Sequence, residues 1–147
     1  MSDTVLNKIA KKYLGITRIA CPVENIDSKV KYKEFDCVYV SSVFEHSKDV
    51  RLAIRNVIRS SKYFQFCFFK WSHDGGLKSE YRKRKGYWSS VFNINMIEQE
   101  ILRHSFIDKS FIVNNKSGEK MDFKKYSQGL KGEHRTGNYL IYQGHSR

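Results

Sequence analysis

Cysteine is scarce in this sequence, and its placement excludes several kinds of site. Cys21, Cys37 and Cys67 are an odd number, lie far apart, and each sits within an apolar run. Buried reduced thiols explain this pattern better than disulfides, and reduced thiols point to the cytoplasm. The cysteines and histidines form no C-x-x-C or H-x-x-x-H pair. We therefore expect no metal site and no disulfide framework.

Long apolar runs are also missing. No stretch reaches the ~20 apolar residues of a membrane-spanning helix, and Lys8, Lys11 and Lys12 interrupt the first apolar segment. We expect neither a membrane span nor a secretory signal peptide. The 147 residues are 40% hydrophobic, which is enough for one core. The prediction is a single domain over residues 1–147.

Acidic residues are few compared with basic ones, and the formal net charge is +12. Such an excess raises the local concentration of anionic partners, including nucleic acid, acidic metabolites and anionic lipid surfaces. A lysine-rich solvated surface explains the same charge equally well. The charge alone does not choose a function.

In the first half of the chain, apolar spacing predicts alternating helices and strands. Asp49 or Ser47 can cap the helix that follows the second strand. The continuous apolar strands between charged flanks are typical of burial on both faces of a parallel sheet. In order, the segments are a helix at 2–14, a strand at Ile16–Cys21, a polar loop at Glu24–Lys33, a strand at Phe35–Val40, a helix over 50–58 and a strand at Tyr63–Phe69.

The second half begins with a polar stretch, Ser72–Gly86, and continues with a helix at Met96–His104, where Asn95 and Glu98 have capping-box spacing. Strands at Phe106–Val113 and Asn138–Gln143 are predicted to pair antiparallel, while residues 119–137 are a short helix or an ordered loop. The order predicts an α/β fold with a mainly parallel sheet and a C-terminal antiparallel strand pair.

One segment carries a family resemblance. Residues 35–46 read FDCVYVSSVFEH, Asp49 follows, and then comes an amphipathic helix. This segment resembles the central part of type-11-like class I S-adenosylmethionine-dependent methyltransferases, which carry FD-V---VLEH--D on their fourth strand and the turn after it. The resemblance implies a Rossmann-like fold, S-adenosylmethionine as cofactor and methyl transfer as activity. The final strand pair matches the reversed hairpin that ends this fold.

The sequence departs from the family at its amino-terminal end. The glycine-rich loop that lets backbone amides approach the cofactor has no counterpart, because Gly75-Gly76 comes after the third visible strand. The acidic residue that holds the ribose would fall just before Ser2, and Asp3 fits a helix cap better. We therefore expect an incomplete methyltransferase fold that lacks the first strand, the glycine-rich loop and the second strand. It is a fragment, a degenerate relative, or half of a split enzyme whose sheet a partner chain completes.

The resemblance places the cofactor-binding residues at two points. Glu24 or Asn25 would lie beside the adenine, in the loop after the family's third strand. Ser41 and Ser42 fall at the carboxyl end of the central strand, where open α/β sheets bind ligands, and would lie near the methyl group. Ordinary turn chemistry explains the two serines as well.

His46 is the candidate catalytic residue, as a base that removes a proton from the methyl acceptor. The Glu-His pair of the family also has a structural use, which is to orient the turn before the helix. The candidate substrate-binding residues are aromatic or imidazole side chains that follow the third visible strand, and core or loop anchoring is the competing interpretation. These residues are Trp71, His73, Tyr87 and Trp88.

We expect the methyl acceptor to be a small-molecule or anionic substrate, because Lys78 and the run Arg82–Lys85 offer cations. An exposed basic loop explains these residues equally well. A non-catalytic binding module for nucleic acid or an acidic protein is the alternative function. In that case Tyr81, Tyr87 and Trp88 would stack on bases, although no nucleic-acid-binding motif is present. A subunit that completes the sheet of another chain is the third possibility.

Overall fold

A computed structural model describes residues 19–68, 71–72, 78–82, 87–114, 117, 119–122 and 138–147. For residues 72, 78–82, 87, 114, 121–122 and 138 it describes the backbone alone. The elements, in chain order, are the 3-10 helix η1 (Val23–Ser28), β1 (Phe35–Ser41), the 3-10 helix η2 (Phe44–His46), α2 (Val50–Arg59), β2 (Ser61–Phe68), β3 (Trp71–Ser72), β4 (Lys78–Arg82), β5 (Tyr87–Asn93), α3 (Ile94–His104), β6 (Ser105–Asn114), β7 (Lys120–Asp122) and β8 (Asn138–Ser146).

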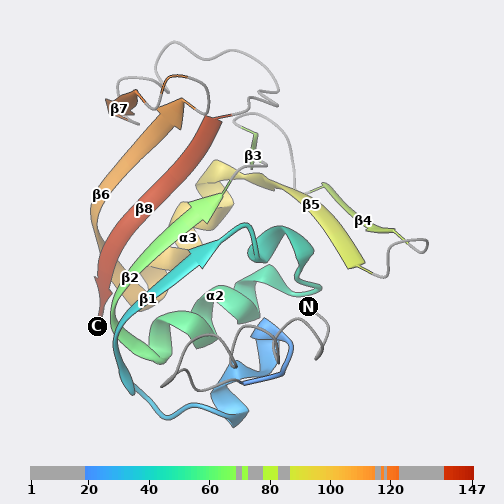
Figure 1. Cartoon of the computed structure of the whole chain (residues 1–147), viewed down its shortest axis with the longest axis vertical. Helices are drawn as coiled ribbons and strands as arrows, with labels where there is room; N and C mark the ends of the chain where they lie inside the picture. The colour runs from blue at the N-terminus through green and yellow to red at the C-terminus, as the bar shows by residue number, and fades with distance from the viewer. Residues whose placement is uncertain are drawn as a thin grey trace, which may run out of the picture.

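Five of the strands form one sheet in the order β1-β2-β8-β6-β7 (Figure 1). β1 and β2 are parallel, while β2–β8, β8–β6 and β6–β7 are antiparallel. The described sheet is thus mixed, and the predicted antiparallel pairing of the last two long strands is confirmed. The predicted strand Ile16–Cys21 falls largely outside the described residues, and its described part, residues 19–21, is not in a strand. The fold is α/β, as expected.

The helix α2 forms where the sequence predicts it. Asp49 caps its start, with Oδ1 accepting a hydrogen bond from the backbone N–H of Leu52 at 3.1 Å. Ala53, Ile54 and Val57 lie on its buried face. This face and the buried face of α3 pack on the side of the sheet that carries Phe64, Phe66 and Phe68, so both helices cover the same face.

The start of α3 corrects one prediction. Asn93, not Asn95, is the cap, and its side chain accepts a hydrogen bond from Met96 N at 3.2 Å. The helix begins earlier than expected because β5 runs directly into it and Ile94, only 1% exposed, belongs to the core. The hairpin of β4 and β5 was not predicted, since β4 lies within the stretch interpreted as a polar connection.

The burial of β1 is also a correction. The sequence predicts burial on both faces, but Phe35, Cys37 and Tyr39 are exposed and Val40 is the buried residue of the strand. Two features explain this: β1 has a neighbour on one side within the described sheet, and the face opposite α2 and α3 carries no described helix. Cys37 is thus an exposed thiol, whereas Cys67 is buried as predicted.

Gly144 of β8 lies where the backbone of β8 closely approaches β6 and the Phe64 side chain. It pairs with Phe64 on one side and with Ile107 on the other. A Cβ atom at this position would overlap the backbone carbonyl oxygen of Phe106 and would lie 2.7 Å from Cζ of Phe64. The absence of a side chain is what lets the Phe64 ring cover the strand here.

Candidate functional site

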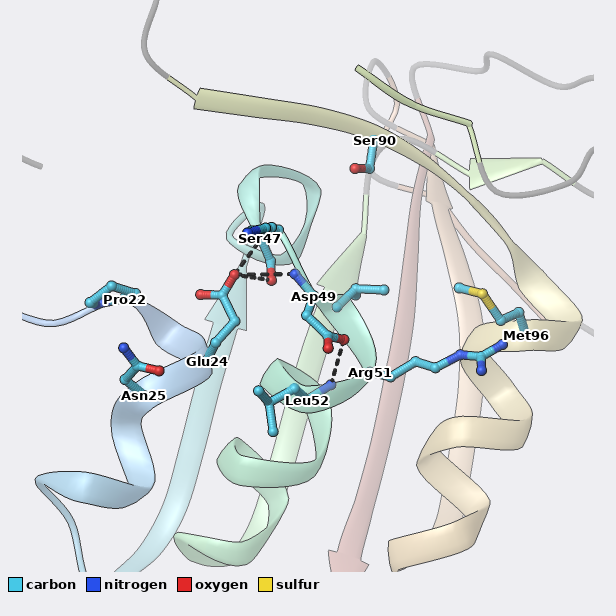
Figure 2. Close-up of a pocket in the computed structure, with 11 residues that line it drawn as sticks. Pro22, Glu24, Asn25, Ser47, Asp49, Arg51, Leu52, Ser90 and Met96 are labelled. Carbon is cyan, nitrogen blue, oxygen red and sulfur yellow. Dashed lines mark hydrogen bonds between the residues drawn. The ribbon is translucent and has the colours of Figure 1, made fainter. Parts of the chain in front are cut away.

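A cleft of about 940 Å³ opens beyond the carboxyl end of β1 (Figure 2). Its volume is that of a small-molecule site, and the carboxyl ends of parallel strands are where open α/β sheets bind ligands. The walls come from the start of η1, the turn after η2, the first turn of α2, β5 and the start of α3. The lining residues are Pro22, Glu24, Asn25, Ser47, Lys48, Asp49, Val50, Arg51, Leu52, Ser90 and Met96.

Glu24 builds one wall of the cleft by joining η1 to the turn before α2. Its Oε1 accepts hydrogen bonds from Ser47 Oγ at 2.8 Å, from Lys48 N at 2.6 Å and from Asp49 N at 3.3 Å. Its backbone carbonyl accepts a further bond from Asn56 Nδ2 at 2.6 Å. Burial raises the pKa of Glu24, but the hydrogen bonds to its carboxylate outweigh burial, and the pKa lies below the ordinary value.

We predict that Glu24 stabilises the fold in a pH-dependent way. Its carboxylate has a lower pKa in the folded chain, so the stabilisation is complete above the unfolded pKa, ordinarily 4.5, and is lost as the pH falls through the folded pKa. Glu24→Gln should lower the free energy of unfolding by about 1–2 kcal/mol at pH 7 and flatten its decline below pH 4.5. Urea denaturation at several pH values measures both effects.

The matched control for this prediction is Asp27→Asn, which changes an exposed carboxyl in the same 3-10 helix. It should leave the free energy of unfolding and its acid dependence close to those of the parent chain. A Glu24→Gln chain that behaved like the control would contradict the role of Glu24 as the joint between η1 and α2.

Asn25 stands beside Glu24 at the mouth of the cleft, with an exposed side chain. The two residues expected at the adenine therefore lie on one wall of the cleft. They differ in how freely their side chains can hydrogen-bond to a ligand. Three donors already surround one oxygen of the Glu24 carboxylate. The Asn25 amide is exposed, and an amide offers the donor and acceptor that a purine edge requires.

Ser41 and Ser42 end β1 but are not among the residues that line the cleft. Ser42 has φ of 56°, in the left-handed region that disfavours non-glycine residues, and its N–H donates to Cys67 O at 3.1 Å. Burial raises the pKa of Cys67, as does the nearby Glu45 charge, while a hydrogen bond with the Ser41 side chain acts in the opposite direction. The backbone strain at Ser42 lies where the strand turns toward the cleft.

His46 is oriented by the β4–β5 hairpin. Its Nδ1 lies 2.9 Å from the backbone carbonyl oxygen of Trp88. Because a carbonyl oxygen can only accept, Nδ1 carries the hydrogen, and the neutral ring has its lone pair on Nε2. His46 is exposed, whereas the preceding Glu45 is fully buried. The Glu-His pair thus divides into a buried carboxyl and an exposed imidazole of fixed tautomer.

Of the expected substrate-binding side chains, the structure describes those of Trp71 and Trp88. Trp71 is only 2% exposed and belongs to the hydrophobic core, which gives it a packing role. Trp88 is partly exposed and holds His46 through its carbonyl. His73, the side chain of Tyr87 and the side chains of Lys78 and Arg82–Lys85 lie outside what the structure describes.

Sequence reasoning missed Lys48, Arg51, Ser90 and Met96 as cleft residues. Arg51 lies in the predicted amphipathic helix, where polar residues are expected to face solvent. Ser90 and Met96 reach the cleft through the unexpected hairpin and the early start of α3. The position of Lys48 and Arg51, next to the Glu-His turn at the first turn of α2, was the one available signal.

Within the described ranges there is no group of three or more His, Cys, Asp or Glu side chains that could hold a metal ion. None of the helices described is long and apolar enough to cross a membrane.

Comparison with solved structures identifies the fold. The chain is similar to a 1,6-didemethyltoxoflavin N1-methyltransferase from Burkholderia thailandensis, solved with S-adenosylhomocysteine bound (14% identity, TM-score 0.64, 99% of this chain and 58% of that one). It is also similar to a S-adenosylmethionine-dependent methyltransferase from Mesorhizobium loti (13%, TM-score 0.66, 98% and 77%). A third likeness is to a putative methyltransferase from Listeria monocytogenes (9%, TM-score 0.64, 99% and 77%).

The other two comparisons found nothing: no family model matches the chain, and no curated protein matches it. The fold is that of the class I S-adenosylmethionine-dependent methyltransferases, as the FDCVYVSSVFEH segment indicated. The chain spans 58% of the length of the first of these solved proteins.

Proposed function

We propose that the chain takes part in S-adenosylmethionine-dependent methyl transfer, as one portion of a methyltransferase domain. The observation that carries this proposal is the cleft beyond the carboxyl end of β1, on a sheet with the methyltransferase fold. The fold favours methyl transfer over the basic binding module. Fold likeness alone does not make an enzyme, so the proposal depends on what the cleft can bind.

The residues present fit the adenine side of the cofactor. The cleft is large enough for a nucleoside, Asn25 offers an exposed amide, and Ser47 and the fixed Glu24 carboxylate form the adjoining wall. S-adenosylmethionine, when bound, supplies a methyl group on a sulfonium that is already a good leaving group. The protein then has to align the acceptor and, for some acceptors, to remove a proton.

His46 is our candidate for proton removal. The Trp88 carbonyl fixes hydrogen on Nδ1, which leaves Nε2 as the basic atom of the neutral ring. Ser41 and Ser42 stand at the end of β1, and the proposal places them near the transferred methyl group although they do not line the described cleft. Trp88 fixes His46, and Trp71 supports the hairpin from the core beneath it.

A second polypeptide segment is part of the proposal. The glycine-rich loop has no counterpart in this sequence, and the outer side of β1 has no paired strand among the described residues. Tyr39 on β1 and Tyr63 on β2 are 62% and 57% exposed, although large aromatic side chains usually gain from burial. A strand added beside β1 would complete the sheet and deliver the missing loop to the cleft. The unpaired cysteines are consistent with a cytoplasmic location for this assembly.

Titration with S-adenosylhomocysteine, followed by amide NMR shifts, tests the proposal. We expect saturable shifts confined to the cleft, at Glu24, Asn25 and residues 47–52, with a Kd on the order of 1 mM because the glycine-rich loop is missing. Adenosine alone should produce shifts at the same η1 amides. No shifts at roughly 10 mM ligand, or shifts confined to amides far from the cleft, would contradict the proposed function.

A further inference from the structure

Two cationic side chains reach the cleft. Lys48 and Arg51 both line it, and Figure 2 shows the Arg51 side chain running from the first turn of α2 toward Met96 at the start of α3. In the described part of the chain, neither side chain forms an ion pair or a hydrogen bond. Both residues are exposed, so each can reorient toward a ligand.

The two acidic residues of the cleft are held by hydrogen bonds to its wall, and neither forms an ion pair with these cations in the described part of the chain. Glu24 Oε1 is held by Ser47 Oγ and by the N–H groups of Lys48 and Asp49. Asp49 Oδ1 caps α2 through the N–H of Leu52. Carboxylates held by N–H donors of the wall have their position fixed by the fold. The cleft therefore has two exposed cations that can pair with a ligand and two carboxylates whose positions are fixed by hydrogen bonds.

The rest of the wall next to the cations is apolar. Val50, Leu52 and Met96 line the cleft on the α2 and α3 side, away from Asn25 on η1. The cleft is thus divided into a polar end suited to a purine and an end where cations stand beside apolar side chains. A ligand for the second end would combine an apolar body with a negatively charged group.

We propose that Arg51 and Lys48 bind an anionic group, a phosphate or a carboxylate, on the methyl acceptor. Arg51 offers a planar guanidinium that pairs with such a group through two parallel hydrogen bonds, and Lys48 adds a compact charge. The acceptor is then an anionic small molecule whose apolar part lies against Met96 and Leu52. This inference rests on the proposed function, because it takes the other end of the cleft for the cofactor.

The carboxylate of the cofactor is the other source of the same chemistry. If Arg51 and Lys48 held that carboxylate, they would contribute to cofactor affinity and not to acceptor affinity. The two assignments differ in what a substitution does to S-adenosylhomocysteine binding. The experiment therefore needs one arm with the cofactor product and one arm with a free anion.

The first arm titrates inorganic phosphate at constant ionic strength into the full chain, with amide shifts as the readout. We expect saturable shifts at Lys48 and Arg51, and a Kd about tenfold higher in Arg51→Gln, the loss expected for one charge-assisted pair. Lys48→Gln should weaken binding in the same direction. The controls are Arg55→Gln, one turn further along α2, and Lys31→Gln, an exposed lysine outside the cleft, and both should bind phosphate like the parent chain.

The second arm measures S-adenosylhomocysteine binding by the same variants, and affinity in Arg51→Gln should be unchanged. Equal phosphate binding by Arg51→Gln and the parent chain would overturn the anion site. A parallel loss of S-adenosylhomocysteine affinity, with competition between phosphate and that ligand, would overturn the acceptor assignment. Phosphate binding at Arg51 without any S-adenosylhomocysteine binding would defeat the proposed function while the anion site stood. Dispersed amide spectra confirm that each variant is folded.

Discussion

Replacing Gly144 with alanine is expected to remove about 3 kcal/mol or more from the free energy of unfolding, the upper range for overpacking a core. The new Cβ would overlap the carbonyl oxygen of Phe106 and approach Cζ of Phe64 to 2.7 Å. Backbone cannot move aside as a flexible side chain can, so β6 and β8 would have to separate. Domains of this size are stable by only about 5–15 kcal/mol. Urea denaturation followed by circular dichroism measures the loss.

Gly144→Ala in a chain that also carries Phe64→Leu distinguishes the clash with the Phe106 carbonyl oxygen from the clash with the Phe64 ring. Phe64→Leu shortens the side chain that covers Gly144 and leaves the Phe106 carbonyl in place. If the carbonyl is the obstacle, Gly144→Ala should cost nearly the same free energy in the Phe64→Leu chain as in the parent. Full rescue by Phe64→Leu would show that the strand pairing tolerates the methyl group, against the geometry described for β6 and β8.

The second large effect concerns Trp71. Trp71→Ala should lower the free energy of unfolding by about 3–5 kcal/mol, the range for deleting a buried aromatic side chain. Trp71 is 2% exposed and belongs to the cluster that includes Phe68 and Phe92. Urea denaturation followed by far-ultraviolet circular dichroism measures the change, as a shift in the midpoint of the transition.

Trp88→Ala is the matched control, because Trp88 is the other tryptophan and is partly exposed. It should cost markedly less stability than Trp71→Ala. The sequence suggested an alternative in which Trp71 contacts the methyl acceptor. That role would leave the stability of Trp71→Ala near that of the parent chain and would change ligand binding alone.

The parts of the fold that could be predicted are those in which local signals agree. α2 combines a capping aspartate with apolar residues at helical spacing, and its start and its buried face were both correct. β2 is a nearly continuous apolar run, and β6 and β8 are apolar runs separated by a turn. In these segments one short stretch of sequence contains both the element and its boundary.

The predictions that were wrong or missing concern features that depend on tertiary contacts. Burial of β1 depends on which strands and helices lie beside it, which no pattern within residues 35–40 records. β4 is rich in charged residues, so apolar periodicity could not reveal it, and it exists because β5 pairs with it. The cap at Asn93 replaced the one at Asn95 because the core needs Ile94 inside the helix.

The sequence indicated where in the fold the candidate site lies better than it indicated which residues line it. The Glu-His segment pointed to the end of the sheet where the cleft opens, and Glu24 and Asn25 lie on the wall of that cleft. Arg51 was not predicted at the site because helical periodicity separates buried from exposed residues but does not show which exposed residues face a cavity. Trp71 was expected near a ligand because its place at a strand end is compatible with a cleft and with the core alike.

The strand order has a consequence for synthesis on the ribosome. β8 follows every other described strand in the chain, yet it lies between β2 and β6 in the sheet. Until residues 138–146 leave the exit tunnel, β2 and β6 have no partner in common, and apolar residues such as Phe66 and Ile112 have no completed core. The described sheet can therefore form only after residues 138–146 have been translated. Before then, the apolar residues of β2 and β6 are exposed to aggregation.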